Sequence, residues 1–136
     1  MSTEKILLVD DDEDVLLVMT LRLMAHGYHV ISAMDAASAL TTARLEFPDL
    51  IILDLGLDLG PPGGNGYSVM AQLKAVPATA SIPVIVLTGK DAEGNQERSY
   101  QTGAVDFFQK PPNTDWLLTA VERALKERAA ANSCLS

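Results

Sequence analysis

Three short runs of consecutive apolar residues constrain the fold of this chain most. They are Ile6–Val9, Leu50–Leu53 and Val84–Leu87. A strand that is apolar at every successive position has both of its faces covered, which is the situation of a strand in a parallel sheet. Two further strand-like runs are His29–Ala33 and Val105–Phe108. The sequence therefore predicts five strands, of which at least three are covered on both sides.

Stretches with helical spacing separate the strands. The first is marked by Val15, Met19 and Leu23, and the second runs from Ala36 to Phe47 behind the capping residue Asp35. The third is marked by Val69, Met70 and Leu73, and the fourth is the weakly apolar stretch Asp91–Thr102. The last runs from Leu117 to Leu125 behind Asn113 or Thr114. Strand and helix alternate five times, which predicts an α/β doubly wound sheet with helices on both faces. We expect the Leu, Met and Val residues of the first helix in the core, and Trp116 and Tyr100 as packing anchors or part of an interaction face.

The size and charge of the chain narrow its class. Its 136 residues fit one domain, which we place at residues 4–128, followed by a flexible tail or truncated linker at 129–136. A net charge of −8 argues against direct nucleic acid binding by this domain. A single cysteine, Cys134, and no recognisable signal or membrane-spanning segment favour a cytoplasmic location.

Polar residues follow four of the predicted strands at the point where each strand ends. Asp10 and Asp11 follow the first, Asp54 the third, Thr88 the fourth and Lys110 the fifth. Ligands of open α/β sheets bind beyond the carboxyl ends of the strands, so we expect these side chains to meet at one edge.

Three neighbouring carboxylates cannot all stay ionised without a compensating charge. A hard cation such as Mg²⁺, bound by carboxylates, a carbonyl and water, supplies that charge. Glu13 and Asp14 suit the positive end of the first helix. Asp12 fits either the start of that helix or a supporting role behind the cation site.

The chain resembles the receiver domain of two-component response regulators, in the chemotaxis-regulator-like superfamily with a flavodoxin-like fold. The resemblance covers about residues 4–128. The matching stretches are "ILLVDD" (Ile6–Asp11), "PDLIILDL" (Pro48–Leu55), "NG" (Asn65–Gly66), "IPVIVLTG" (Ile82–Gly89) and "GAVDFFQKP" (Gly103–Pro111). Each piece is weak alone, but they occur in order and most of them at a predicted strand end.

The resemblance implies a role for each matching position. Asp54 is the phosphoacceptor, and Mg²⁺ or Mn²⁺ is held by Asp10, Asp11, Asp54 and the Gly56 carbonyl. Thr88 and Lys110 contact the phosphoryl group, and Thr88 and Phe107 form the switch. The Lys110–Pro111 bond is cis. The implied donor is a sensor histidine kinase or a histidine phosphotransfer protein. A homodimer through the face built from the helix at 91–102, the fifth strand and the last helix is possible in such a family.

The chain departs from the family pattern near Asp54. The loop between Gly56 and Asn65 is longer than usual, and we interpret it as a tolerated surface insertion, with a role in partner access or dephosphorylation as the alternative. Phe107 replaces a commoner tyrosine, so the switch side chain lacks a hydroxyl group.

Two other classes compete with a signalling receiver. A Mg²⁺-dependent aspartyl phosphatase of the haloacid dehalogenase type also carries a D-x-D motif after its first strand, but Asp14 stands where that motif has Thr or Val. A phosphate-independent docking domain is expected to lack the acids that are present here. The sequence therefore favours a phosphoacceptor rather than a metabolic enzyme.

Overall fold

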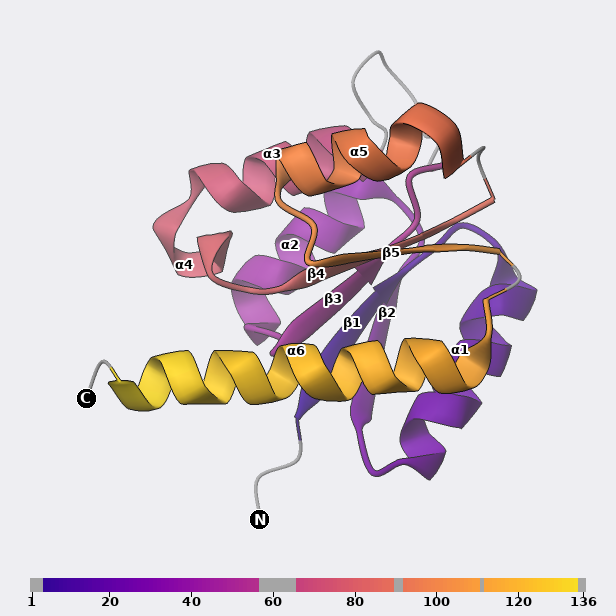
Figure 1. Ribbon diagram of the computed structural model, residues 1–136, viewed down its shortest axis with the longest axis horizontal. Coiled ribbons are helices and arrows are strands. Elements are labelled where there is room, and N and C mark those ends of the chain that lie inside the picture. The colour runs from indigo at the N-terminus through magenta and orange to yellow at the C-terminus, as the bar shows by residue number, and fades with distance from the viewer. Residues whose placement is uncertain (1–3, 57–65, 90–91, 111, 135–136) are drawn as a thin grey trace.

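Five parallel strands form one sheet in the order β2-β1-β3-β4-β5 (Figure 1). The computed structural model describes residues 4–56, 66–89, 92–110 and 112–134. The strands are β1 (Lys5–Val9), β2 (His29–Ala33), β3 (Leu50–Leu53), β4 (Val84–Thr88) and β5 (Asp106–Gln109). The order reverses at β1, since β2 lies on one side of it and β3 on the other, as in other doubly wound sheets.

Helices cover both faces of the sheet (Figure 1). On one face lie α2 (Ala36–Glu46), α3 (Gly66–Ala75) and α5 (Ala92–Thr102). On the other lie α1 (Glu13–Ala25) and α6 (Thr114–Cys134), and the short helix α4 (Pro77–Ala80) lies between α3 and β4 in the chain. The predicted α/β doubly wound, five-stranded parallel sheet is therefore confirmed.

The apolar runs are explained by two separate cores. Leu7 and Val9 of β1 belong to the core under α2 and α3, whereas Ile6 and Leu8 belong to the core under α1 and α6. Successive residues of a strand point to opposite faces, so a strand between two cores is apolar at every position. Each of these side chains is at most 1% exposed, and burial of one such side chain contributes roughly 1.5–3 kcal/mol.

Side-chain caps fix the starts of three helices. Asp12 caps α1 by accepting hydrogen bonds from the backbone amides of Asp14 and Val15, and this places it at the helix start, one of the two roles left open above. Asp35 caps α2 as predicted, by accepting from the Ser38 amide at 2.7 Å. Asn113 accepts from the Trp116 amide ahead of α6.

Some element boundaries differ from those expected. Strand β5 begins one residue later than predicted. Helix α6 continues to Cys134, six residues past Arg128, where we placed the end of the domain. Helix α4 was not expected, because four residues are too few to show a helical period. It is held by Thr79, whose hydroxyl donates to the Leu73 carbonyl at 2.7 Å.

The expectation that the apolar residues of α1 are all core is wrong. Leu16, Met19 and Leu23 are buried, but Leu17, Val18, Leu21 and Met24 are 52–60% exposed. A straight helix on a sheet buries only one stripe, and α1 carries apolar residues beyond that stripe. Trp116 is also 69% exposed, so it does not anchor the core.

Candidate functional site

The pairing of β1 with β3 brings Asp10 and Asp54 together. Val9 is in register with Leu53, so the two acids are the next residues on neighbouring strands. The Asp54 amide donates to the Val9 carbonyl at 2.9 Å, and the Asp10 amide donates to the Ala33 carbonyl at 3.1 Å. Backbone hydrogen bonds thus fix both acids at the carboxyl edge of the sheet.

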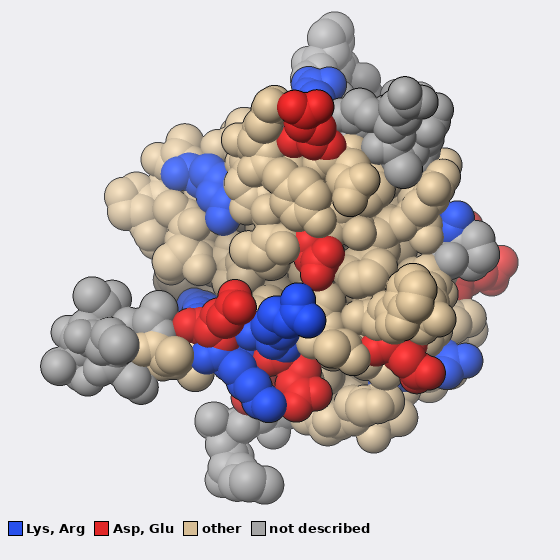
Figure 2. Space-filling view, viewed as in Figure 1, with Lys and Arg blue, Asp and Glu red and all other residues tan. Residues whose placement is uncertain are grey.

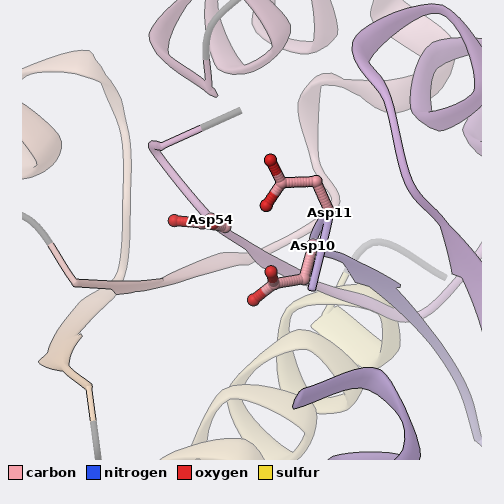
Figure 3. Close-up of side chains that lie close together, drawn as sticks. All are labelled: Asp10, Asp11 and Asp54. Carbon is pink, nitrogen blue, oxygen red and sulfur yellow. The ribbon is translucent and has the colours of Figure 1, made fainter. Parts of the chain in front are cut away.

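Three carboxylates converge at this edge, as expected (Figure 3). Asp10, Asp11 and Asp54 each offer an oxygen atom, and these atoms lie within 4.8 Å of one another. Asp10 and Asp54 are buried, whereas Asp11 is exposed to solvent. The cluster is therefore accessible to solvent at Asp11 and enclosed by the protein around Asp10 and Asp54.

Lys110 links two of these acids. Its Nζ atom lies 2.6 Å from Asp10 Oδ2 and 3.3 Å from Asp54 Oδ2. The Lys110 amide donates to the carbonyl of Thr88 at 2.8 Å, which places the end of β5 beside the end of β4. Thr88 itself is fully buried at the end of β4. The structure thus brings the predicted hydroxyl and ammonium residues to the same edge as the acids.

The site has an excess of negative charge. Burial raises the pKa of Asp10 above its usual value, although hydrogen bonds from Lys110 and from the Asp12 amide oppose the change. Burial also acts to lower the pKa of Lys110, but the hydrogen bond to Asp10 and the charge of Asp54 outweigh it, so this pKa is raised. One ammonium faces three carboxylates, which leaves room for a further positive charge.

Backbone amides orient the carboxylates, a detail that the sequence did not predict. Gly56 donates its amide to Asp54 Oδ1, and Asp12 donates its amide to Asp10 Oδ1, both at 2.9 Å. Gly66 packs so closely that a β-carbon there would lie 2.6 Å from the Asp54 carbonyl oxygen. The "NG" motif was the only signal for this last contact.

Phe107, the expected switch residue, points into the protein. It is 8% exposed and belongs to the core under α2 and α3. The switch role of Phe107 stays a prediction. The residues of the long loop at 57–65, and Pro111 with its expected cis bond, lie outside the described residues.

The fold and this cluster define an open α/β protein whose candidate site lies at the carboxyl edge of the sheet. Residues 6–122 match the family model of the response regulator receiver domain, and the chain belongs to this family. It is therefore a receiver domain of two-component signalling. The haloacid dehalogenase alternative finds no support in these comparisons.

Individual relatives agree with the family. The chain is 38% identical to the response regulator PleD of Caulobacter vibrioides over 121 residues, which are 89% of this chain but only 26% of PleD. It is 33% identical to the protein PilH of Pseudomonas aeruginosa, with 89% of this chain and 97% of PilH covered. Many of the other curated relatives are longer, and the chain spans about half of PhoB of Escherichia coli (52%).

Solved structures show the same fold. A CheY-like response regulator receiver domain protein of Methanospirillum hungatei superposes with a TM-score of 0.85 at 28% identity. The superposition covers 96% of this chain and 99% of that one. Within the described residues, no helix has both the length and the apolar character needed to cross a membrane.

Proposed function

We propose that Asp54 accepts a phosphoryl group and that Lys110 and Thr88 assist the transfer. The observation that carries this proposal is the position of Lys110, whose ammonium group contacts both Asp10 and Asp54. A carboxylate surrounded by other carboxylates attacks phosphorus poorly, because the transferring oxygens are also negative. A fixed ammonium beside Asp54 offsets part of this repulsion without reorganisation.

Mg²⁺ or Mn²⁺ fits the donor set of the site. The residues that would hold it are Asp10, Asp11, Asp54 and the backbone carbonyl of Gly56. All three side chains offer hard oxygen ligands, and Lys110 neutralises only one of their charges. When bound, the cation supplies positive charge against the oxygens of the phosphoryl group.

The phosphodonor that we infer is a phosphohistidine on a sensor histidine kinase or a histidine phosphotransfer protein. A carboxylate oxygen of Asp54 forms a bond to phosphorus while the bond from phosphorus to the donor imidazole nitrogen breaks. The electron pair of that bond returns to the imidazole ring. Lys110 donates hydrogen bonds to the phosphoryl oxygens, and Thr88 donates one after its side chain turns toward them. The product is an acyl phosphate on Asp54. We place this transfer of the phosphoryl group in the cytoplasm.

The phosphoryl signal would leave the site through the face formed by α5, β5 and α6. Phe107 of β5 packs in the core and is paired with Val86, two residues before Thr88, so a movement of Thr88 would change the space beside Phe107. Exposed aromatic residues lie on these elements: Trp116 at 69% and Tyr100 at 43% exposure. Figure 2 shows this side of the molecule, where acidic and basic side chains gather over the C-terminal half of α6. The face would serve a downstream partner, an output domain or a homodimer.

Labelling with acetyl phosphate in the presence of Mg²⁺ tests this function. We expect intact protein mass to rise by one phosphoryl group, with little turnover of the donor, and the Asp54→Asn variant to stay unlabelled. Sustained turnover would assign the site to a phosphatase instead. Absence of any labelling, with Mg²⁺ present and the protein folded, would assign the chain to the docking domains that work without phosphate.

A further inference from the structure

Helix α5 is attached to the rest of the fold by little apolar surface. Its sequence, Ala92–Thr102, contains no Leu, Ile, Val, Met or Phe, and its one aromatic residue, Tyr100, is 43% exposed. Among residues 96–102, the part of α5 whose side chains the structure describes, only Ser99 is buried. A helix with few buried contacts moves at low cost, so each single contact matters to its position.

Arg98 ties α5 to α3, which lies beside it (Figure 1). Its guanidinium carbon lies 3.8 Å from the centre of the Tyr67 ring. Tyr67 is 8% exposed and belongs to the core under α2 and α3, whereas Arg98 is exposed. A cation over the face of an aromatic ring is attracted to it, and Arg98 forms no ion pair among the described residues. The contact therefore joins an exposed helix to a buried ring.

The Tyr67 end of this contact is fixed to the segment that carries Asp54. The preceding residue, Gly66, donates its amide to the Leu55 carbonyl at 3.4 Å. A β-carbon at Gly66 would lie 2.6 Å from the Asp54 carbonyl oxygen, so the start of α3 packs directly on this backbone. Tyr67 is therefore held in place relative to Asp54.

The Arg98 end of the contact is connected to Thr88 instead. Thr88 ends β4, and α5 begins four residues later, at Ala92. In the proposed function the Thr88 side chain turns toward a phosphoryl group on Asp54, and the chain that follows Thr88 leads into α5. If α5 follows Thr88 while α3 stays with Asp54, Arg98 moves relative to Tyr67 and the contact weakens.

We propose that Arg98 is a positioning residue, which holds α5 in its present place through Tyr67 and thereby opposes the shift that phosphorylation causes. This inference rests on the proposed function of Asp54. A contact that is stronger in one conformation than in another favours the first by the difference between the two. Removal of the Arg98 side chain should therefore shift α5 toward the phosphorylated conformation about two- to fivefold, the factor that an exposed cation–π contact represents.

Hydrogen exchange and the binding of beryllofluoride, an anion that takes the place of the phosphoryl group on a carboxylate, test this role together. In the chain without ligand, Arg98→Ala should raise the exchange rates of α5 amides about two- to fivefold and leave those of α3 unchanged. Alanine favours a helix at least as strongly as arginine does, so lost helix propensity cannot produce this result. In calorimetric titrations with Mg²⁺ present, Arg98→Ala should bind beryllofluoride about two- to fivefold more tightly than the parent chain.

Three variants separate the contact with the ring from other effects. Arg98→Lys keeps a cation near the ring, so both measurements should lie between those of the parent and of Arg98→Ala. In a chain that already carries Tyr67→Leu, Arg98→Ala should have no further effect on either measurement, because the ring is absent. Arg123→Ala, which removes an exposed arginine from α6, should change neither measurement.

The outcomes that would overturn the inference are distinct. Unchanged beryllofluoride affinity in Arg98→Ala, even with faster exchange in α5, would reduce Arg98 to a support of the helix. Weaker affinity would mean that the contact persists in the phosphorylated conformation. An undiminished effect of Arg98→Ala in the Tyr67→Leu chain would assign Arg98 to another partner. These three results leave the proposed function intact, whereas a parent chain that binds no beryllofluoride would refute that function and this inference with it.

Discussion

Replacement of Gly66 by alanine should damage the fold at the candidate site itself. Gly66 begins α3, and its amide donates to the Leu55 carbonyl at 3.4 Å. A β-carbon at this position would lie 2.6 Å from both the Asp54 carbonyl oxygen and the Leu55 Cα atom. Both of these are backbone atoms of the segment that carries Asp54, so no flexible side chain can move away.

The size of the effect follows from this geometry. To reach an ordinary contact near 3.4 Å, the start of α3 and the backbone at Asp54 must separate by about 0.8 Å. The buried side chains of Val69, Met70 and Leu73 hold helix α3 in the core and therefore resist this shift. Overpacking of this kind costs about 1–3 kcal/mol. At roughly 3 °C per kcal/mol for a domain of this size, the melting temperature should fall by about 3–9 °C.

Urea denaturation of Gly66→Ala and of a matched control measures this cost. The control is Gly89→Ala, because a β-carbon at Gly89 meets no atom within 4 Å. We expect a lower midpoint at unchanged slope for Gly66→Ala, and a change within about 0.5 kcal/mol for Gly89→Ala. A Gly66→Ala variant as stable as the parent would refute the close packing of α3 against the Asp54 backbone.

Three further changes probe the charges and contacts described above. Lys110→Met leaves the buried Asp10 carboxylate without its partner, so it should cost about 1–3 kcal/mol at pH 7, with a smaller loss at acidic pH where Asp10 becomes neutral; denaturation at both pH values measures this. Because the pKa of Asp10 is raised, protons should compete with Mg²⁺ at a higher pH than at an ordinary aspartate. Calorimetric titrations should therefore show Mg²⁺ affinity falling as the pH decreases through that pKa, and affinity that is constant down to about pH 4 would contradict this. Arg128→Ala removes hydrogen bonds to the Pro48 carbonyl and to Asp49, and it should cost about 1 kcal/mol in denaturation, against almost nothing for the exposed Arg123→Ala.

The sheet and its site could be predicted because strand patterning carries both. Apolar runs such as Ile6–Val9 indicate strands with two covered faces, and parallel order then places the residues after each strand at one edge. Asp10 and Asp54 meet for this reason alone, since their strands are in register at Val9 and Leu53. The acids could therefore be located without knowledge of any distance.

Other features depend on packing that a pattern does not encode. The sequence of α1 has apolar residues on several sides, and only the position of the sheet decides that Leu16 is buried and Leu17 is not. Helix α4 is tied to the end of α3 by a hydrogen bond from the Thr79 hydroxyl to the carbonyl of Leu73, six residues earlier, and such a contact has no periodic signal. The hydrogen bond from the Gly56 amide to Asp54 could not be predicted either, because a backbone donor does not depend on the type of residue that carries it.

The most direct test of the central claim is to locate the acyl phosphate in the chain. The protein is treated with acetyl phosphate and Mg²⁺, reduced with borohydride, which converts an aspartyl phosphate into homoserine, and mapped by peptide mass spectrometry. The account predicts homoserine at position 54 alone, and its loss when Mg²⁺ is chelated. Homoserine at Asp10 or Asp11, or equal labelling of Asp54 without a divalent cation, would contradict it.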